Sequence, residues 1–380
     1  MAITAECLPL PSPSTIEAEW KALEKRAAPN FFRSWCWIGT WIETAVLPHV
    51  GQEAARLLRV HDDATLIGLG IVCASRVRRL LGRSTAAFFL SETGADRLDA
   101  PTVEYNGFLA VSGREGEVFA AAVNELVSRR DLDVGPWAWS VGMFNAVTEI
   151  ESVAVDKARI PYRVRKTENC PVISLTAAGL DAYYASISRN TRQQLRRAIS
   201  LAKANNELTL MRAPPNEADS YFRELKTLHQ DAWQIRRGHA GAFADAHFET
   251  FARALIKRGV SDGNVELIRI SSAGGTIGVL MNFRSGTDVF AYQSGFRYSG
   301  DNRFKPGLIC HVLAAEDAAN RGASAYHFMA GQNRYKRSLG NASETMYWLE
   351  IGRGDLLWWA ESSLHRFRDL LRPPSPSVEA

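Results

Sequence analysis

The chain has 380 residues, a formal net charge of +4, 46% hydrophobic and 23% charged residues, which is the composition of a folded protein long enough for two domains. These values exclude a largely disordered chain, and no uncharged apolar run reaches the roughly 18 residues needed to span a membrane. The N-terminus, MAITAECLPLPSPS, lacks the basic start and apolar core of a signal peptide, so we expect a cytoplasmic protein.

The first half of the chain predicts helices followed by strands, as in an αβ domain. The first 14 residues and residues 373–380 are rich in proline and serine, so we expect loose termini. Helices are predicted over 15–26 and 31–50, and the tryptophans of the second are typical of a core. The remaining predicted elements are strands at 55–60, 64–74, 85–90, 104–111 and 137–141 and a helix at 115–130.

The second half contains a strand meander between helices. Apolar runs at 265–271, 276–284 and 288–296 are joined by links so short that only antiparallel neighbours are allowed. A helix then begins at Pro306, a residue preferred at the first helical position, and stops at Gly322. The other predicted elements are strands at 171–175, 207–212, 323–329 and 345–351 and helices at 181–204, 217–235, 247–258, 334–339 and 356–372.

Charge is concentrated in one segment. Between residues 151 and 212 there are eleven basic and five acidic residues, a net charge of +6. Arg189, Arg192 and Arg196 fall on one face of the predicted helix. Such a surface favours an anionic partner, such as a phosphorylated molecule or an acidic lipid surface, or it is a solvated helix face. The five cysteines form no CxxC pair and no HxH or HxxxH spacing occurs, so we expect no metal site.

Four stretches are informative, namely SWCWIGTW and VEYNGFLA in the first half and residues 229–248 and 304–340 in the second. They resemble the CelD-like acetyltransferases of cellulose and exopolysaccharide biosynthesis, a family with the GNAT fold that is related to the FemX/FemAB aminoacyltransferases. The resemblance implies an α/β (α+β) protein with two GNAT-like domains in tandem, each a mostly antiparallel mixed sheet flanked by helices. We expect an N-terminal domain over 15–160, a C-terminal acyltransferase domain over 166–355, a helix over 356–372 and a flexible tail over 373–380.

The resemblance also implies an acyl-donor site. In the GNAT fold the fourth strand and the helix after it hold acyl-CoA, and the free N–H groups of that helix bind its pyrophosphate. Here Gln293 and Ser294 end the third strand of the meander, and Lys336 lies near the start of the short helix predicted over 334–339. The loop and helix start contain Arg303, Lys305, Gly307 and Leu308. The usual Gln/Arg-x-x-Gly-x-Gly/Ala run is absent.

Catalysis of acyl transfer to an amine requires a proton donor for the leaving group and a base for the amine. Tyr335 occupies the place of the proton-donating tyrosine of the fold. His327 replaces the acidic residue usual in the preceding strand and is a candidate base, because imidazole titrates near neutral pH. Candidate acceptor-binding residues are Glu104, Tyr105, Asn106, His229 and Trp233.

These features predict an N-acyltransferase that uses acetyl-CoA or another acyl-CoA as co-substrate, with no bound cofactor. The acceptor is expected to be an amino sugar of a cell-surface polysaccharide or its lipid-linked precursor. We also expect contact with polysaccharide machinery or the inner membrane face, and no DNA. The alternatives are a catalytically silent GNAT-like binding module and, ranked lower, a FemX-like transferase with an aminoacyl-tRNA donor.

Overall fold

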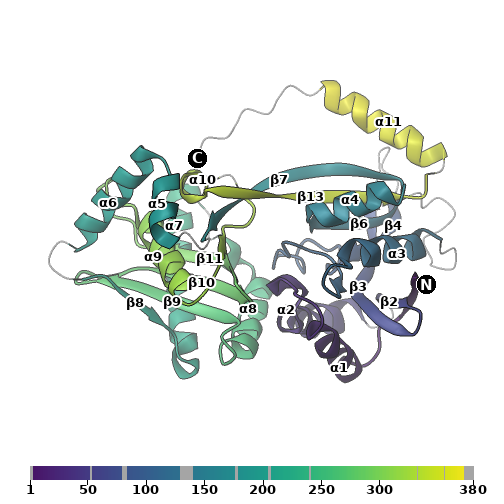
Figure 1. Cartoon of the computed structure of the whole chain (residues 1–380), viewed down its shortest axis with the longest axis horizontal. Coiled ribbons are helices and arrows are strands. Elements are labelled where there is room, and N and C mark those ends of the chain that lie inside the picture. The colour runs from purple at the N-terminus through teal and green to yellow at the C-terminus, as the bar shows by residue number, and fades with distance from the viewer. Residues whose placement is uncertain are drawn as a thin grey trace. The chain divides into compact units, whose positions relative to one another are not determined.

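The computed structural model describes residues 3–51, 54–78, 84–128, 140–175, 179–203, 207–238, 241–331, 333–354 and 356–371 (Figure 1). The predicted tail at 373–380 lies outside them. The chain divides into two compact units, Met1–Glu168 with Thr345–Ala380, and Asn169–Glu344. Each unit has a hydrophobic core of its own. Two long strands, β7 (Tyr162–Ser174) and β13 (Ala342–Gly352), have residues in both units.

The first unit has the strand order β1-β2-β3-β4-β6-β13, with β5 paired to β3. Among the strand pairs described there, β4 with β6 is parallel and the others are antiparallel. Its other elements are β1 (Ile3–Pro9), α1 (Pro13–Glu24), α2 (Trp35–Trp41), β2 (Ala55–Asp62), β3 (Thr65–Arg78), β4 (Ser84–Leu90), β5 (Leu109–Ala110), α3 (Glu115–Ser128), β6 (Ser140–Val147), α4 (Glu149–Lys157) and α11 (Leu356–Leu371).

The second unit has the strand order β7-β12-β11-β10-β9-β8. Only β11 and β12 run parallel among the strand pairs described there. Its other elements are α5 (Gly179–Ser186), α6 (Arg189–Lys203), β8 (Thr209–Arg212), α7 (Ala218–Arg237), α8 (Ala246–Gly259), β9 (Val265–Ser272), β10 (Gly275–Ser285), β11 (Asp288–Phe296), α9 (Pro306–Asn320), β12 (Ala325–His327) and α10 (Arg334–Leu339).

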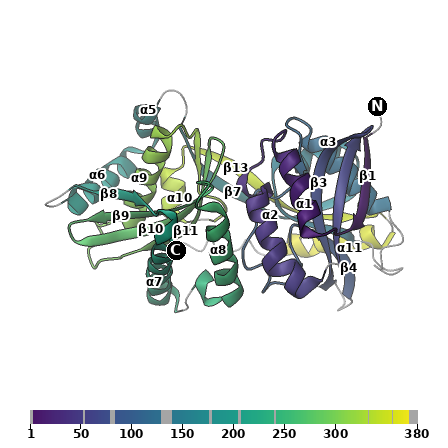
Figure 2. The ribbon, with the colours of Figure 1, turned by 90° about the horizontal axis from the view of Figure 1, so that it is seen from below.

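Helices cover both faces of the sheet in the second unit. Figure 2 shows α9 on one face of β9 to β11 and α7 on the other. The alternation of side chains along β11 fits this arrangement, since Ala291 packs into the core with α9 while the next residue, Tyr292, stacks on Phe248 of α8. The prediction of an α/β fold with a mostly antiparallel mixed sheet flanked by helices is confirmed.

The structure corrects the predicted N-terminus. Residues 3–9 are not loose but form β1, which pairs antiparallel with β2 over seven residues. Only Cys7 of this strand is buried, and Glu6 lies 3.9 Å from Arg59 on β2. Backbone pairing with the sheet edge holds the strand, and Ile3, Ala5 and Cys7, which alternate with exposed Thr4 and Glu6, face the core of the first unit.

Two further predicted elements differ. The helix expected over 181–204 is two helices, because the Ser188 side chain accepts the Thr191 N–H at 3.0 Å and starts α6. Arg192 then donates to the carbonyls of Tyr184, Ala185 and Ile187 at the end of α5. The strand expected over 104–111 is reduced to Leu109–Ala110.

The second compact unit ends earlier in the chain than the expected C-terminal domain. Residues 345–352 of β13 pair with β6 of the first unit, for example Leu349 with Phe144, and contribute Leu349 and Ile351 to its core. The second unit therefore ends at Glu344, where the resemblance placed a domain end at 355. The expected domain limits stay a prediction.

Candidate active site

The edge of β11 becomes accessible where β11 and β12 separate. Within β11, only Asp288, Val289 and Phe290 pair with β12 among the described residues. From Ala291 to Phe296, β11 pairs with β10 alone among the described residues. Residues 291–294 are half-buried, although the strand lies inside the sheet order and its preceding residues are buried. The separation therefore opens a part of β11 to a ligand.

A bulge lies in this open part of β11. Met281 of β10 faces Gln293, but the next residue, Asn282, faces Ala291, so Tyr292 is an extra residue. Bulges turn a strand and are frequent beside active sites. Gln293 and Ser294, predicted to bind the acyl donor, follow the bulge directly and are half-buried.

In the first unit, the corresponding place beside two parallel strands is occupied by a segment of the unit itself. β4 and β6 are parallel and pair only through Phe88 and Phe89. Asn106 bridges to Val147 beyond this pairing, and its N–H donates to Ala146 at 2.9 Å. Its side chain donates to the Leu90 carbonyl at 2.8 Å.

Three predicted acceptor residues, Glu104, Tyr105 and Asn106, belong to this filling segment and are buried. Arg33 donates to the carbonyls of Tyr105 at 3.1 Å and Asn106 at 2.8 Å, and pairs with buried Glu151 at 2.6 Å. The polar groups of Asn106 therefore hold the first unit together. The structure places these three residues in a different unit from the other predicted site residues.

The start of α9 follows the open strand and has the features of an anion site. Pro306 is the first helical residue, and the first helical hydrogen bond is donated by Ile309 to the Lys305 carbonyl at 3.1 Å. The N–H groups of Gly307 and Leu308 therefore have no acceptor within the helix. Lys305 is exposed, and no ion pair to it occurs among the described residues.

Arg303, by contrast, is already paired. Its guanidinium donates to both oxygens of Asp301, with Nη2 to Oδ2 at 2.6 Å. The hydrogen bond from Arg303 lowers the pKa of Asp301 to about 2. A phosphate at this loop would therefore meet Lys305 and the helix N–H groups before it met a free Arg303.

Tyr335 lies on α10 against the core of the second unit. Its ring stacks on His311 of α9, with centroids 5.3 Å apart and an interplanar angle of 11°. Burial and then the nearby Tyr298 raise the pKa of Tyr335, while a hydrogen bond with Asn333 opposes the rise. The hydroxyl therefore keeps its proton at neutral pH, as a proton donor must.

Lys336, predicted to bind a phosphate, also supports the loop after β12. Its Nζ donates to the Ala330 carbonyl at 2.8 Å. The loop contains two residues with left-handed backbone, Met329 with φ 62° and Gly331 with φ 119°. A non-glycine residue in this region is strained and is common beside functional sites.

His327 is a buried imidazole between two carboxylates. Its Nδ1 lies 3.3 Å from Glu344 and its Nε2 3.6 Å from Asp288, and its ring stacks on Phe290. Burial lowers the pKa of His327, but the two carboxylates outweigh it and raise the pKa to about 9. At neutral pH the imidazole is therefore charged and has no lone pair with which to accept a proton.

His229 and Trp233 lie on α7 over β11. His229 Nδ1 lies 2.9 Å from the Ser294 carbonyl, and because a carbonyl only accepts, Nδ1 carries the proton and Nε2 the lone pair. Burial lowers the pKa of His229, so the ring is neutral at pH 7. Phe243 and Trp233 surround the ring, with centroids 4.9 and 5.7 Å away.

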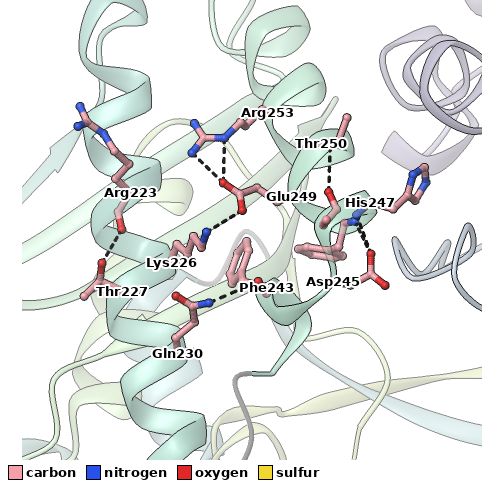
Figure 3. A network of polar contacts seen from close by, with 12 residues as sticks. Arg223, Lys226, Thr227, Gln230, Phe243, Asp245, His247, Glu249, Thr250 and Arg253 are labelled. Atoms are coloured by element: carbon pink, nitrogen blue, oxygen red, sulfur yellow. Dashed lines mark hydrogen bonds and ion pairs between the residues drawn. The ribbon is translucent and has the colours of Figure 1, made fainter.

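A polar network fixes the helix that carries His229 (Figure 3). Lys226 of α7 pairs with Glu249 of α8 at 2.6 Å, and Arg253 pairs with the same carboxylate at 2.9 Å. Gln230, next to His229, donates to the Phe243 carbonyl at 3.4 Å. These contacts join α7, the segment before α8, and α8 itself.

One buried polar group at this site was not predicted from the sequence. Asn282, His311 and Tyr326 come from β10, α9 and β12 and are 2% exposed or less. Tyr326 is hydrogen-bonded to both of the others. Asn282 and His311 are each a single polar residue in an apolar run, which is the signal that could have marked them, whereas Tyr326 stands next to His327.

Part of the second unit matches a known domain family. Residues 189–337 match the acetyltransferase (GNAT) domain family, and this match includes α9, the open part of β11 and residues 334–337 of α10. The chain is an acyltransferase. No curated protein matches it in sequence.

The fold over most of the chain is similar to that of several solved structures. FemX superposes with a TM-score of 0.58 at 12% identity, over 94% of this chain and 100% of FemX. L-PGS of Bacillus licheniformis has a TM-score of 0.51 at 11% identity, over 94% and 98%. The C-terminal domain of a protein assigned as a lysylphosphatidylglycerol synthetase in Agrobacterium fabrum has 0.53 at 9%, over 94% and 98%. At these sequence identities, the structural similarity establishes the fold alone.

Within the described residues, no helix is long and apolar enough to cross a membrane. The same residues contain no group of three or more His, Cys, Asp or Glu side chains placed to hold a metal ion.

Proposed function

We propose that the chain transfers an acyl group from acyl-CoA, acetyl-CoA in the first instance, to the amine of an amino sugar. The observation that carries the proposal is the separation of β11 from β12 directly before the N-terminus of α9. The separated edge provides backbone groups for an extended donor, and Lys305 with the free N–H groups of Gly307 and Leu308 provides a site for its phosphates. The match to the GNAT domain covers these residues.

The reaction requires two proton transfers. The acceptor nitrogen attacks the acyl carbonyl, the bond from the carbonyl carbon to the donor sulfur breaks, and the departing thiolate takes a proton. We assign that proton to the Tyr335 hydroxyl. We assign the amine proton to His229 rather than His327, because His229 is neutral with a lone pair on Nε2 whereas His327 is charged.

The assignment of the base is tested by His229→Gln. A glutamine cannot accept the amine proton, so kcat at pH 7 should fall about 10²- to 10⁴-fold. Activity should rise steeply with pH in the variant, because the free amine then forms without a base. A pH profile parallel to that of the wild-type protein would exclude His229 as the base.

The acceptor is proposed from the CelD-like resemblance, as an amino sugar of a cell-surface polysaccharide or its lipid-linked precursor. Tyrosine, tryptophan and histidine rings over β11 support it, since sugars pack their apolar faces on aromatic rings. Trp233 is half-buried and stands beside His229. A cytoplasmic location, with contact to polysaccharide machinery or the inner membrane face, stays a prediction.

A second donor is supported by the surface of α6. Arg189, Arg196 and Arg197 are exposed, and they form no ion pair among the described residues. Arg197 is close enough to Asp301, in the loop before α9, to lower its pKa. Such a surface beside the donor helix fits the phosphates of an aminoacyl-tRNA, the donor implied by the resemblance to FemX.

One experiment separates the two donors. The protein is incubated with glucosamine-type acceptors and labelled acetyl-CoA, or with labelled aminoacyl-tRNA, and transfer is measured. In parallel, acetyl-CoA at about 100 times its Kd should stabilise the folded protein by about 2.7 kcal/mol. Transfer and stabilisation with acetyl-CoA support the proposal, whereas transfer from tRNA alone would replace it with the second donor.

A further inference from the structure

His311 projects from the second turn of α9 to the place where β11 and β12 separate. Its ring is 2% exposed. It meets Phe296 at the end of β11, Phe328 just after β12 and Tyr335 on α10, with centroids 5.7, 5.2 and 5.3 Å away. One aromatic neighbour thus ends β11, another directly follows β12, and the third is the proposed proton donor.

Hydrogen bonds indicate which ring nitrogen of His311 carries the proton. Asn282 Nδ2 donates to the Tyr326 hydroxyl oxygen at 3.4 Å. The Tyr326 hydroxyl lies 2.9 Å from His311 Nδ1 and has its own proton to donate there. This arrangement favours Nδ1 as the acceptor and Nε2 as the nitrogen that carries the ring proton. Burial, and then the charge of Lys336, lower the pKa of His311 to about 3, so the ring stays neutral.

The Nε2–H group has no partner within the described residues. A buried N–H without an acceptor is unfavourable, and natural proteins rarely keep one without a function. A phenylalanine at this position would fill the same aromatic surroundings without the unpaired group. The polar chain of Asn282, Tyr326 and His311 therefore maintains a hydrogen-bond donor that none of the described residues accepts.

We propose that His311 is a further catalytic residue, whose Nε2–H donates a hydrogen bond to the acyl carbonyl oxygen of the bound donor as that oxygen becomes negatively charged. Tyr326 and Asn282 are positioning residues that hold the ring in the required tautomer. The inference rests on the proposed function, because it places the reacting carbonyl in the opening beside Tyr335. A donor held in place before the reaction stabilises developing charge without reorganisation.

The test compares two substitutions in the full chain by steady-state transfer from acetyl-CoA. His311→Phe keeps a ring to stack on Tyr335 but has no nitrogen, whereas His311→Gln can place an amide N–H near the position of Nε2. We expect His311→Phe to lower kcat about 10²- to 10³-fold with little change in the donor KM. His311→Gln should recover part of this loss.

Urea unfolding of each variant gives the folded fraction, so that kcat is expressed per folded molecule. A merely structural histidine would lower stability and leave this kcat unchanged. Wild-type kcat per folded molecule in His311→Phe would overturn the proposal. So would a rise in the donor KM with unchanged kcat.

A second measurement is independent of activity. Long-range proton–nitrogen NMR correlations of labelled histidines show which nitrogen of His311 carries the proton. We expect Nε2–H in the wild-type protein and a loss of this preference in Tyr326→Phe. Finding Nδ1–H in the wild-type protein overturns the inference whatever the donor is. If the wild-type protein shows Nε2–H but transfers nothing from acetyl-CoA, the proposed function fails and the catalytic role fails with it, while the positioning of His311 stands.

Discussion

Replacing His327 by glutamine should destabilise the protein by an amount that depends on pH. The imidazole is 7% exposed at its side chain and lies within 3.3 Å of Glu344 and 3.6 Å of Asp288. Its pKa rises from 6.5 to about 9 on folding. Since each pKa unit corresponds to about 1.36 kcal/mol, the charged form contributes about 3 kcal/mol to the free energy of unfolding.

The sign follows from proton binding. Because the pKa is higher in the folded state, the folded protein binds the proton more tightly, and the contribution is complete below about pH 6.5. It falls as the pH rises from 6.5 and is lost once the pH passes about 9, where the folded imidazole also deprotonates. The wild-type protein should thus lose stability relative to His327→Gln over this interval.

The assay is urea unfolding of both proteins at several pH values from 6 to 10. The loss of stacking on Phe290 is common to all pH values, so the change in the difference between the proteins isolates the charge. His229→Gln is the matched control with the opposite sign, because burial lowers the pKa of that histidine, so its contribution to stability rises instead of falling as the pH passes through about 6.5. A stability difference for His327→Gln that stays constant or grows between pH 6 and 10 would refute the reasoning.

Three further outcomes concern catalysis. Tyr335→Phe removes only the hydroxyl proton, so kcat should fall about 10²- to 10⁴-fold while donor KM and stability stay the same; wild-type kcat would remove the tyrosine from the mechanism. Lys305→Ala removes a charge-assisted phosphate contact of about 1.5–3 kcal/mol and should raise the donor Kd about 10- to 150-fold, measured by titration with acetyl-CoA; an unchanged Kd would place the phosphates elsewhere. Gly241→Ala puts a methyl group 2.5 Å from His229 Nε2 and 2.8 Å from Trp233, at a backbone φ of 67°. It should lower kcat and stability together, and full activity would show that Nε2 is not used.

The local pattern of the sequence was sufficient for most elements of the second unit. The meander of β9, β10 and β11 is predicted from short turns between apolar runs, and the start of α9 from Pro306. These features depend on residues within one turn or one strand. The first half of β7 was not predicted, because its side chains are largely exposed and its pairing partner is distant in the chain. The strand β1 has the alternation of a half-buried strand, but its pairing with β2 also depends on residues distant in the chain.

The chemical state of the site residues was decided only by the tertiary structure. His229, His311 and His327 are the same residue type in the sequence, yet two are neutral and one is charged. His327 is charged because Asp288 and Glu344, from different strands, reach it from both sides. His311 is neutral because the fold buries it among aromatic rings, and His229 because it is buried with Nδ1 on the Ser294 carbonyl. A sequence specifies which groups can titrate, but the distance to each charge and the access of water set the pKa, and both are properties of the folded chain.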